Sequence, residues 1–292
     1  MAIKFNSAVQ SAYLQQGKIR NDQLVEIVKD ATGINNLLVE ATRHTIISGA
    51  PGVGKTYTTL DEIDTSGIPY TTITPGMSDI AITVNLAYRL YNLPEDEDLI
   101  CVVDDADDVV FGDIRALNKW KLATQDDEPK WTHEVDFSGT FTKLKKQGKT
   151  AEIEALKHFQ EDGSIGVTID LDRVRFIILC NTDLEDSKQL SAKLFKSVEA
   201  VLDRFRYETL TMPWAEKWGW LAHILTTTQP FDNIELTNAQ KKEILVWLYA
   251  NWDNIKSNSG ASYRYVRKMA ADMINYPDAY LDKWTRGLKT NA

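Results

Sequence analysis

An eight-residue, glycine-rich segment constrains the fold of this chain more than any other part of its sequence. It reads G-A-P-G-V-G-K-T at residues 49–56 and has the form GxxxxGK[ST]. Residues 44–48 before it read as a short buried strand, and residues 55–63 open a helix. Glycines at such a turn let backbone N–H groups converge on a phosphate, and the helix N-terminus adds a partial positive charge. The segment therefore predicts a phosphate-binding loop.

The residue types of this loop point to a nucleotide and a metal. We expect the Lys55 ammonium to reach the β- and γ-phosphates of ATP and the Thr56 hydroxyl to ligate Mg²⁺. A chance match to the motif is the alternative, and the strand before it and the helix after it argue against that alternative. The residues expected to bind the nucleotide are Gly49, Pro51, Gly52, Val53, Gly54, Lys55, Thr56 and Tyr57.

A second apolar run ends in a group of acids. Residues 99–103 read L-I-C-V-V and are followed by D-D-A-D at residues 104–107. A buried strand of an open α/β sheet delivers such a carboxylate at its carboxyl end, where ligands of these sheets bind. We expect Asp104 to hold Mg²⁺, directly or through water, because Mg²⁺ prefers oxygen ligands. An acidic surface loop is the alternative, but a magnesium nucleotide requires this motif together with the phosphate-binding loop.

A third apolar run, residues 175–180, is followed by Asn181. A lone asparagine after a strand is usually a turn former. Its place in the chain, after the loop and the acidic strand, favours another role, in which Asn181 orients a water molecule near the γ-phosphate.

Short apolar runs alternate with helical stretches from residue 44 onward, which is typical of a parallel sheet with crossover helices. We therefore predict an α/β fold with a five-stranded parallel sheet in an αβα sandwich and a C-terminal helical lid domain. The expected strands are residues 45–48, 70–74, 100–103, 175–180 and 207–212, and the expected helices between them are residues 55–63, 79–91, 114–124 and 191–202.

The composition changes along the chain. We expect a helical lead-in at residues 1–42, a nucleotide-binding core at residues 43–213 with an insertion at about 126–172, and a helical lid domain at residues 214–292. In the lead-in, Asn21 or Asp22 would cap a helix at residues 23–29, and Gly33 would end it.

Tryptophans are concentrated in the lid domain, where helices are expected at residues 221–225, 239–249 and 263–274. Most of these tryptophans fall at helical spacing with other apolar residues. They indicate a packed core rather than stacking platforms for bases.

The order of these motifs resembles that of the AAA+ ATPase superfamily. After the loop, the acidic strand and the strand before Asn181 come D-R-F at residues 203–205 and S-Y-R at residues 262–264 of the helical domain. The resemblance covers about residues 35–280. The run at residues 104–107, with L-N-K at 117–119 and then Trp131, is also similar to small AAA+ ATPases of bacteriophages.

The resemblance implies roles for three residues. Asn181 would be the sensor 1 residue, and Arg204 the arginine finger that reaches the γ-phosphate bound by a neighbouring subunit. Arg264 would be the sensor 2 arginine, which contacts the phosphates in its own subunit. Arg206 is a rival for the finger and Arg267 for sensor 2, and an ordinary surface arginine is the alternative in each case.

The activity implied is Mg²⁺-dependent ATP hydrolysis in a homo-oligomeric ring or arc, with a hexamer as the expected ring. Phosphoryl transfer requires neutralisation of charge on the γ-phosphate, so a subunit without its neighbour's arginine should be a poor ATPase. AAA+ proteins usually have a glutamate after the Mg²⁺-binding acid, whereas this chain has the shorter Asp105. We assign Asp105 as the general base. Slow hydrolysis, a shifted backbone, and a contribution from Asp107 or Asp108 are the alternatives.

The insertion is longer than a simple crossover requires. Residues 131–137 and 165–171 look like two alternating strands, and a helix is expected at residues 151–159. In AAA+ rings, insertions here commonly face the central pore and grip DNA or polypeptide. Four lysines between the strands favour nucleic acid, with a solvated loop as the alternative: Lys143, Lys145, Lys146 and Lys149.

Three functional readings follow. A motor or loader of DNA metabolism is slightly favoured by the lysines, a protein-remodelling chaperone of the MoxR kind is the second reading, and an ATP-dependent assembly scaffold with little hydrolysis is the third, indicated by Asp105. The partners are thus further copies of the chain and a macromolecular client, either nucleic acid or protein.

Composition narrows the setting. A net charge of -9 argues against non-specific coating of nucleic acid, although a local basic stripe remains compatible with it. Cys101 and Cys180 lie in apolar runs and are expected in the core, in a reducing compartment. No apolar stretch approaches the roughly 20 residues that span a bilayer, and residues 1–20 lack the apolar region of a signal peptide. We therefore expect no membrane partner and a cytoplasmic location, in the host cytoplasm if the protein is phage-encoded.

Overall fold

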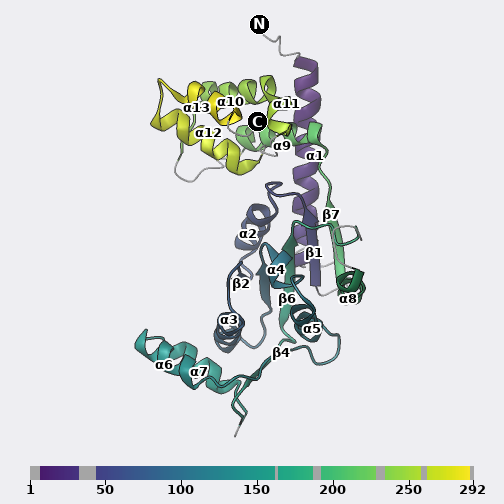
Figure 1. The fold of residues 1–292 in the computed structure, drawn as a ribbon, viewed down its shortest axis with the longest axis vertical. Helices are drawn as coiled ribbons and strands as arrows, with labels where there is room; N and C mark the ends of the chain where they lie inside the picture. The colour runs from purple at the N-terminus through teal and green to yellow at the C-terminus, as the bar shows by residue number, and fades with distance from the viewer. Residues whose placement is uncertain are drawn as a thin grey trace. The chain divides into compact units, whose positions relative to one another are not determined.

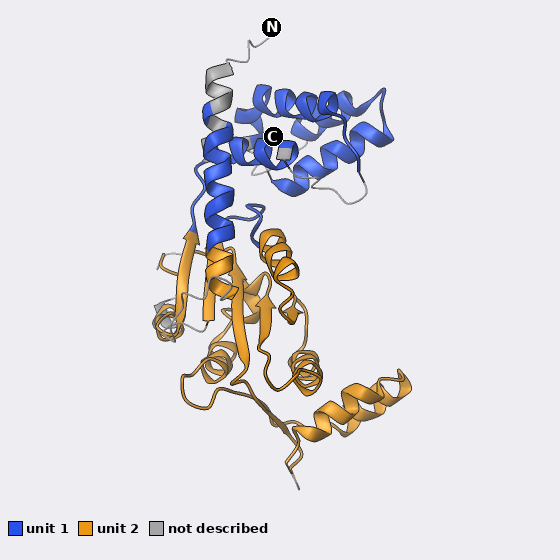
Figure 2. Ribbon diagram, turned by 180° about the vertical axis from the view of Figure 1, so that it is seen from behind, with its two compact units in different colours: residues 1–26, 50–55, 210–292 blue, residues 27–49, 56–209 orange. Residues whose placement is uncertain are grey.

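The chain forms two compact units in a computed structural model that describes residues 7–32, 44–161, 164–186, 192–227, 234–257 and 262–289. One, which we call the helical unit, comprises Met1–Glu26, Ala50–Lys55 and Leu210–Ala292 (Figure 2). The other, the sheet unit, comprises Ile27–Gly49 and Thr56–Thr209. The phosphate-binding loop is therefore divided, since its central residues group with the helical unit.

A five-stranded parallel sheet forms the centre of the sheet unit (Figure 1). The strand order is β2-β3-β6-β1-β7. In chain order the strands span His44–Gly49 (β1), Tyr70–Ile73 (β2), Leu99–Val103 (β3), Val174–Cys180 (β6) and Phe205–Leu210 (β7). β1 and β3 are buried throughout, as expected of parallel strands covered on both faces. The predicted α/β fold with five parallel strands is confirmed.

Helices connect these strands. They span Lys55–Ser66 (α2), Asp79–Tyr91 (α3), Ala106–Val109 (α4), Ile114–Ala123 (α5) and Ala192–Leu202 (α8). Side-chain caps define two of the starts: the Ser78 hydroxyl accepts from the N–H of Ala81 before α3, and the Asp113 carboxylate accepts from the N–H of Ala116 before α5. The four predicted crossover helices correspond to α2, α3, α5 and α8, and Ser191, the first residue predicted for α8, lies outside the described residues.

The crossover connections reverse direction between β1 and β6. From β1 the chain passes through α2 to β2 at one edge of the sheet, whereas from β6 it passes through α8 to β7 at the other edge. Neighbouring strands whose connections leave in opposite directions open a crevice outside their carboxyl ends, where ligands of such sheets bind. Gly49 ends β1 and Asn181 follows β6, so both residues lie at this crevice.

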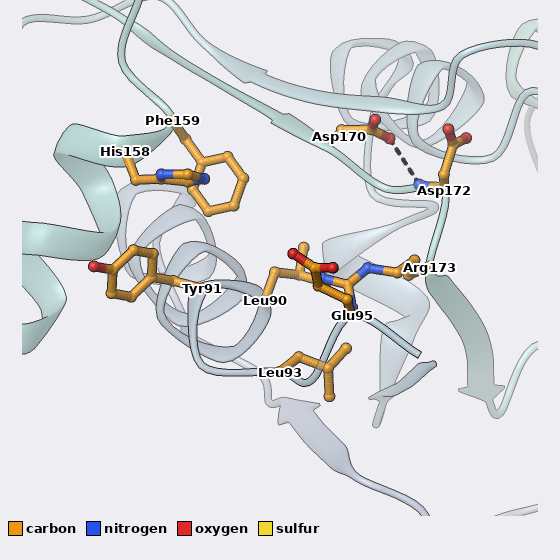
Figure 3. Close-up of a pocket in the computed structure, with 9 residues that line it drawn as sticks. All are labelled: Leu90, Tyr91, Leu93, Glu95, His158, Phe159, Asp170, Asp172 and Arg173. Carbon is orange, nitrogen blue, oxygen red and sulfur yellow. Dashed lines mark hydrogen bonds between the residues drawn. The ribbon is translucent and has the colours of Figure 1, made fainter. Parts of the chain in front are cut away.

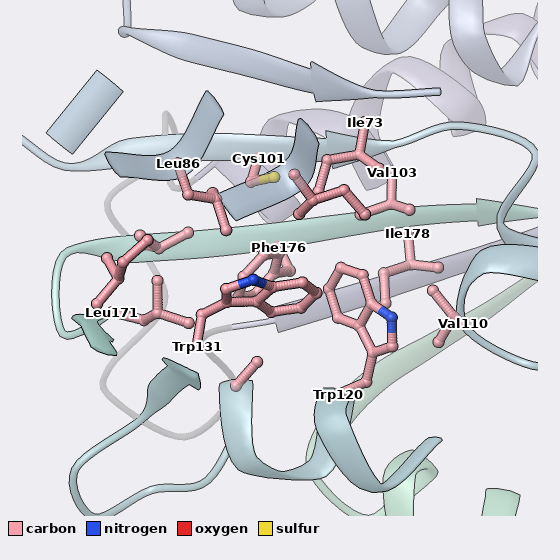
Figure 4. Close-up of a cluster of buried hydrophobic side chains, with 14 of the residues drawn as sticks. Ile73, Leu86, Cys101, Val103, Val110, Trp120, Trp131, Leu171, Phe176 and Ile178 are labelled. Carbon is pink, nitrogen blue, oxygen red and sulfur yellow. The ribbon is translucent and has the colours of Figure 1, made fainter. Parts of the chain in front are cut away.

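An aromatic cluster packs against one face of the sheet (Figure 4). Trp120 of α5 meets Trp131 and Phe176 edge-on, with ring centroids 5.3 and 5.2 Å apart. Both indole N–H groups are satisfied, because Trp131 donates to the Thr83 hydroxyl at 3.0 Å and Trp120 donates to a backbone carbonyl. The cluster therefore holds the insertion and α5 to the sheet. Cys101 and Cys180 are buried in this core, as predicted.

The insertion contains a two-stranded antiparallel ribbon and a pair of helices. Lys130–His133 (β4) pairs with Val167–Asp170 (β5), and the helices Ser138–Lys146 (α6) and Thr150–His158 (α7) lie between them in the chain. The predicted strand at residues 131–137 is therefore too long. It ends early because the Asp136 carboxylate accepts hydrogen bonds from the N–H and the hydroxyl of Ser138, which starts α6.

The first helix, Ser7–Thr32 (α1), is continuous, so the predicted cap at Asn21 or Asp22 is wrong. Tertiary packing explains the difference. Arg20 forms an ion pair of 2.6 Å with Glu216, and a Cβ on Gly17 would lie 2.2 Å from the carbonyl oxygen of Gly219. These contacts hold α1 against the helix at Trp214–Thr227 just before residues 21 and 22, where a local cap would have started a new helix. Gly33, the predicted end of the helix, lies outside the described residues.

Five helices complete the helical unit among the described residues. They span Trp214–Thr227 (α9), Asn238–Ala250 (α10), Trp252–Ser257 (α11), Tyr263–Asn275 (α12) and Tyr280–Lys289 (α13). Trp218, Trp220 and Trp284 are buried in their core, which confirms the prediction that these tryptophans pack inside. None of the helices in the described ranges combines the length and apolarity needed to cross a bilayer.

Candidate functional site

The phosphate-binding loop turns through backbone angles that require glycine. Gly52 and Gly54 have φ of 76° and 92°, in the left-handed region that other residues rarely adopt. A Cβ on Gly52 would also lie 2.4 Å from the Cβ of Ser262, the residue that caps α12 through the N–H of Tyr265. The glycine thus serves two purposes within the helical unit, since it permits the turn and lets the start of α12 approach the loop.

Lys55 begins α2 with its side chain folded along the loop. The residue is 7% exposed, and its ammonium donates a hydrogen bond of 3.3 Å to the carbonyl of Ala50. Tyr57, two residues further, is half exposed. A cation held beside a turn rich in backbone N–H groups suits the negative charge of a phosphate chain.

Thr56 and Asp104 supply two oxygens suited to magnesium. The Thr56 hydroxyl donates a hydrogen bond of 2.7 Å to the Asp104 carboxylate, and the N–H of Asp104 donates to the carbonyl of Ile73 at the end of β2. A hydroxyl and a carboxylate at a helix start fit Mg²⁺, which binds through one or two protein oxygens together with substrate phosphates and water. The described residues contain no cluster of three or more His, Cys, Asp or Glu that could hold a metal.

Asp105 and Asn181 meet across the carboxyl ends of β3 and β6. Asp105 has φ 45° and ψ 53°, a left-handed conformation that is uncommon for a residue with a side chain. The Asn181 amide donates a hydrogen bond of 3.0 Å to the Asp105 carboxylate. The two residues predicted to act on the attacking water are therefore in direct contact.

Asp107 binds the backbone that follows β6. Its carboxylate accepts hydrogen bonds of 2.9 Å from the N–H of Asn181 and from the N–H of Thr182. Burial alone would raise the pKa of Asp107, but the hydrogen bonds from Thr182 and Asn181 outweigh burial and hold this pKa below its usual value. The carboxylate is thus ionised at neutral pH.

Two further contacts hold the segment after β6. The Ser48 hydroxyl at the end of β1 donates to the carbonyl of Thr182 at 2.8 Å. The Tyr207 hydroxyl on β7 donates to the Asp183 carboxylate at 3.1 Å and accepts from the N–H of Leu184 at 2.9 Å. Ser48 and Tyr207 therefore bind the residues that follow Asn181 in this segment.

The two candidates for the arginine finger differ in their contacts. Arg204 directly precedes β7 and donates one hydrogen bond of 2.6 Å to the carbonyl of Lys121. Arg206 is bound by two carboxylates of its own chain, Asp30 at 3.0 Å and Glu208 at 2.7 Å. These ion pairs occupy the Arg206 guanidinium within its own chain, whereas the contact of Arg204 is with a backbone carbonyl.

The two candidates for sensor 2 lie one turn apart on α12, and both are exposed. Arg264 is two residues from Ser262, whose backbone and side chain approach Gly52 of the loop. Arg267 lies one turn further along the helix.

A separate pocket of about 340 Å³ lies at the opposite end of the strands (Figure 3). Tyr91, His158 and Phe159 provide aromatic walls, and Arg173, which directly precedes β6, is on its rim. Asn181 follows the other end of β6. This pocket contains none of the predicted site residues and is not part of the nucleotide site.

The sequence did not identify the anchoring roles of Asp107, Ser48 and Tyr207. Asp107 appeared as an alternative base, whereas its oxygens accept backbone N–H groups. The acidic run after β3 was a usable signal for Asp107. Ser48 and Tyr207 carry no such signal, because their partners are backbone groups distant in the chain.

Comparison with known proteins gives one relative in sequence. The chain is 26% identical over 231 residues to an uncharacterized 36.7 kDa protein in the nrdC-mobD intergenic region of enterobacteria phage T4, which covers 77% of this chain and 62% of that protein. The chain thus spans less than two thirds of the length of this relative. No family model matches the chain.

Two solved structures overlay on the chain with low similarity. A katanin structure concerned with self-assembly has 11% identity and a TM-score of 0.37, and covers 80% of this chain and 68% of the katanin chain. Domain III of the replication initiation protein DnaA from Thermotoga maritima has 12% identity and a TM-score of 0.42, and covers 87% of this chain and 83% of that domain.

Replacing Gly52 with alanine tests whether the close approach at the loop matters for nucleotide binding. Gly67 is the matched control, because its φ is 72° but nothing lies within 4 Å of an added Cβ. Gly67→Ala should lower the free energy of unfolding by about 1 kcal/mol through backbone strain. Gly52→Ala should lower it further, because its Cβ also meets Ser262. Gly52→Ala alone should weaken ATP binding, measured by titration with a fluorescent ATP analogue. Equal affinity in the two variants would contradict the role of Gly52.

Proposed function

We propose that this chain is a Mg²⁺-dependent ATPase of the AAA+ type that works as a ring or arc of identical subunits. The hydrogen bond of 2.7 Å between Thr56 and Asp104 carries this proposal. It brings a hydroxyl from the helix after the phosphate-binding loop to a carboxylate after β3, which is the donor set that a magnesium nucleotide needs. A chance glycine-rich turn has no reason to be matched by an acid at this point.

Hydrolysis requires a water in line with the γ-phosphate. We propose that the Asp105 carboxylate takes a proton from this water while the Asn181 amide orients the pair. The water oxygen then bonds to the γ-phosphorus, the bond from that phosphorus to the bridging oxygen breaks, and ADP and phosphate leave. Lys55 stabilises the charge that develops on the phosphates, and bound Mg²⁺ would polarise them.

A neighbouring subunit would complete the site. Arg204 is the candidate because its contact is a hydrogen bond to the neutral Lys121 carbonyl, whereas Arg206 is bound by two carboxylates. An arginine supplied by a partner subunit typically accelerates phosphoryl transfer by about a thousandfold or more. Turnover per subunit should therefore rise with protein concentration as subunits assemble.

The Arg204→Ala variant should lose this rise in specific activity, while its ATP affinity stays close to that of the unmodified protein. Arg206→Ala is the matched control, since it should lower stability by loss of its ion pairs but keep the rise. Steady-state phosphate release, measured over a range of protein concentrations, distinguishes the two. If Arg206→Ala abolished the rise and Arg204→Ala did not, the assignment would be reversed.

An ATP-dependent scaffold is the second candidate, and Asp105 is the observation that favours it. Its carboxylate is one methylene shorter than that of a glutamate and is already held by Asn181. A scaffold would assemble with ATP yet release almost no phosphate in the same experiment. Both candidate functions predict assembly that depends on ATP. They differ in the rate of ATP turnover, which is high for the ATPase and close to zero for the scaffold.

The client that we favour is DNA or a replication protein bound to DNA. All four lysines of the predicted cluster are exposed, and three of them, Lys143, Lys145 and Lys146, fall in the last turn of α6, a helix without acidic residues. Lys149 precedes α7 and forms an ion pair of 3.5 Å with Glu152. Lysines at the C-terminal end of a helix also stabilise the helix dipole, so their position alone does not indicate a ligand. Their exposure leaves them accessible to phosphates, which is what supports the nucleic-acid reading. A MoxR-like protein remodeller is the alternative within this class. The proposed location is the cytoplasm of a phage host, which fits the relative from phage T4.

Removal of charge from this helix tests the nucleic-acid reading. The double variant Lys145→Ala, Lys146→Ala should retain basal ATP turnover but lose most of any stimulation by DNA, and the salt dependence of DNA affinity should fall by about one unit of log–log slope per phosphate contact removed. Lys241→Ala, Lys242→Ala on α10 removes the same charge elsewhere and should leave both quantities unchanged. Equal stimulation of the two double variants would argue for a protein client.

A further inference from the structure

Asp107 takes no chemical part in the hydrolysis described above, yet both of its oxygens are engaged at the site. We propose that Asp107 is a positioning residue, which acts through Asn181 and fixes the distance between the Asn181 amide and the Asp105 carboxylate. This inference rests on the proposed ATPase function, because it concerns how that site is held in order.

The contacts of Asp107 cross from one strand end to the next. Asp107 lies in the first turn of α4, after β3, and its two oxygens each accept a backbone N–H, from Asn181 and from Thr182, at 2.9 Å. The Asn181 amide nitrogen is 3.4 Å from the same carboxylate and 3.0 Å from that of Asp105. One asparagine is thus held through its backbone by Asp107 while its side chain contacts Asp105.

The left-handed conformation of Asp105 explains how two acids so close in sequence reach the same residue. With φ 45° and ψ 53°, the chain reverses its local direction between the end of β3 and the start of α4. Such strain is uncommon away from functional sites and persists where surrounding contacts hold it. The hydrogen bonds that Asp107 accepts from the backbone after β6 are contacts of this kind.

The contact at its observed distances uses both oxygens of a carboxylate. One oxygen accepts the N–H of Asn181 and the other the N–H of Thr182, each at 2.9 Å, and the second oxygen also lies 3.3 Å from the Asn181 nitrogen. An asparagine at position 107 would keep one acceptor oxygen and place an NH₂ donor in the other position. One N–H would then face a donor, which leaves a polar group without its partner and shifts the segment. The same occupied oxygens argue that Asp107 does not accept the proton of the attacking water.

The test compares Asp107→Asn with two controls in the full-length protein. Asp127→Asn makes the same change of charge at an exposed residue, and Tyr207→Phe removes hydrogen bonds to Asp183 and Leu184 of the same segment without touching the contacts of Asn181. The measured quantities are kcat, the Kd for a non-hydrolysable ATP analogue with Mg²⁺, thermal stability, and hydrogen exchange of the segment containing the Asn181 and Thr182 amides.

Asp107→Asn should lower kcat by about tenfold to a hundredfold, since small displacements of catalytic groups have effects of this size, while the Kd stays unchanged. The same substitution made on an Asn181→Ala background should have little further effect on kcat, because Asp107 acts through Asn181. Exchange of the Asn181 and Thr182 amides should become faster. Tyr207→Phe should lower stability without this loss of kcat, and Asp127→Asn should change none of the four.

The inference would be overturned if the wild-type protein hydrolysed ATP and Asp107→Asn had the same kcat. It would also be overturned if Asp107→Asn and Tyr207→Phe lost kcat equally and in proportion to their losses of stability. The same holds if the effects of Asp107→Asn and Asn181→Ala on kcat were fully additive. If the wild-type protein neither bound nor hydrolysed ATP, the proposed function would fail instead, and unchanged amide exchange in Asp107→Asn would still count against the contact itself.

Discussion

The hydrogen bond between the Thr56 hydroxyl and the Asp104 carboxylate joins parts of the chain that are separated by a whole crossover. Thr56 follows β1 and Asp104 follows β3, and β6 lies between these strands in the sheet. The two side chains meet because parallel strands in register end at the same edge, where α2 also begins. The candidate metal site therefore depends on the register of three strands, which the buried apolar runs of β1, β3 and β6 maintain.

A second set of contacts ties the same edge together around Asn181. The segment after β6 is bound by Asp107 on the β3 side, by Ser48 at the end of β1 and by Tyr207 on β7. Arg204, the candidate finger, directly precedes β7, the strand whose Tyr207 binds the segment after Asn181.

Much of this architecture is readable from the sequence, because the apolar runs of a buried parallel sheet and the phosphate-binding loop are strong local signals. The five strands and their crossover helices follow from them, and so does the pairing of Thr56 with Asp104. The misses have a tertiary cause. α1 passes through Asn21 and Asp22 because Gly17 packs on Gly219, and the strand predicted at residues 131–137 ends early because Asp136 binds Ser138, the first residue of α6. The roles of Ser48 and Tyr207 are invisible in sequence, since hydroxyl groups that bind distant backbone leave no pattern.

The most direct test of the account measures how Mg²⁺ affects the binding of a non-hydrolysable ATP analogue to the wild-type protein and to Asp104→Asn. The account predicts that Mg²⁺ tightens binding to the wild-type protein, and that Asp104→Asn still binds the analogue but loses most of this enhancement, because the amide is a poor replacement for the carboxylate. Calorimetric titration at fixed analogue and varied Mg²⁺ gives both quantities. Absence of nucleotide binding by the wild-type protein, or an equal enhancement by Mg²⁺ in the two proteins, would contradict it.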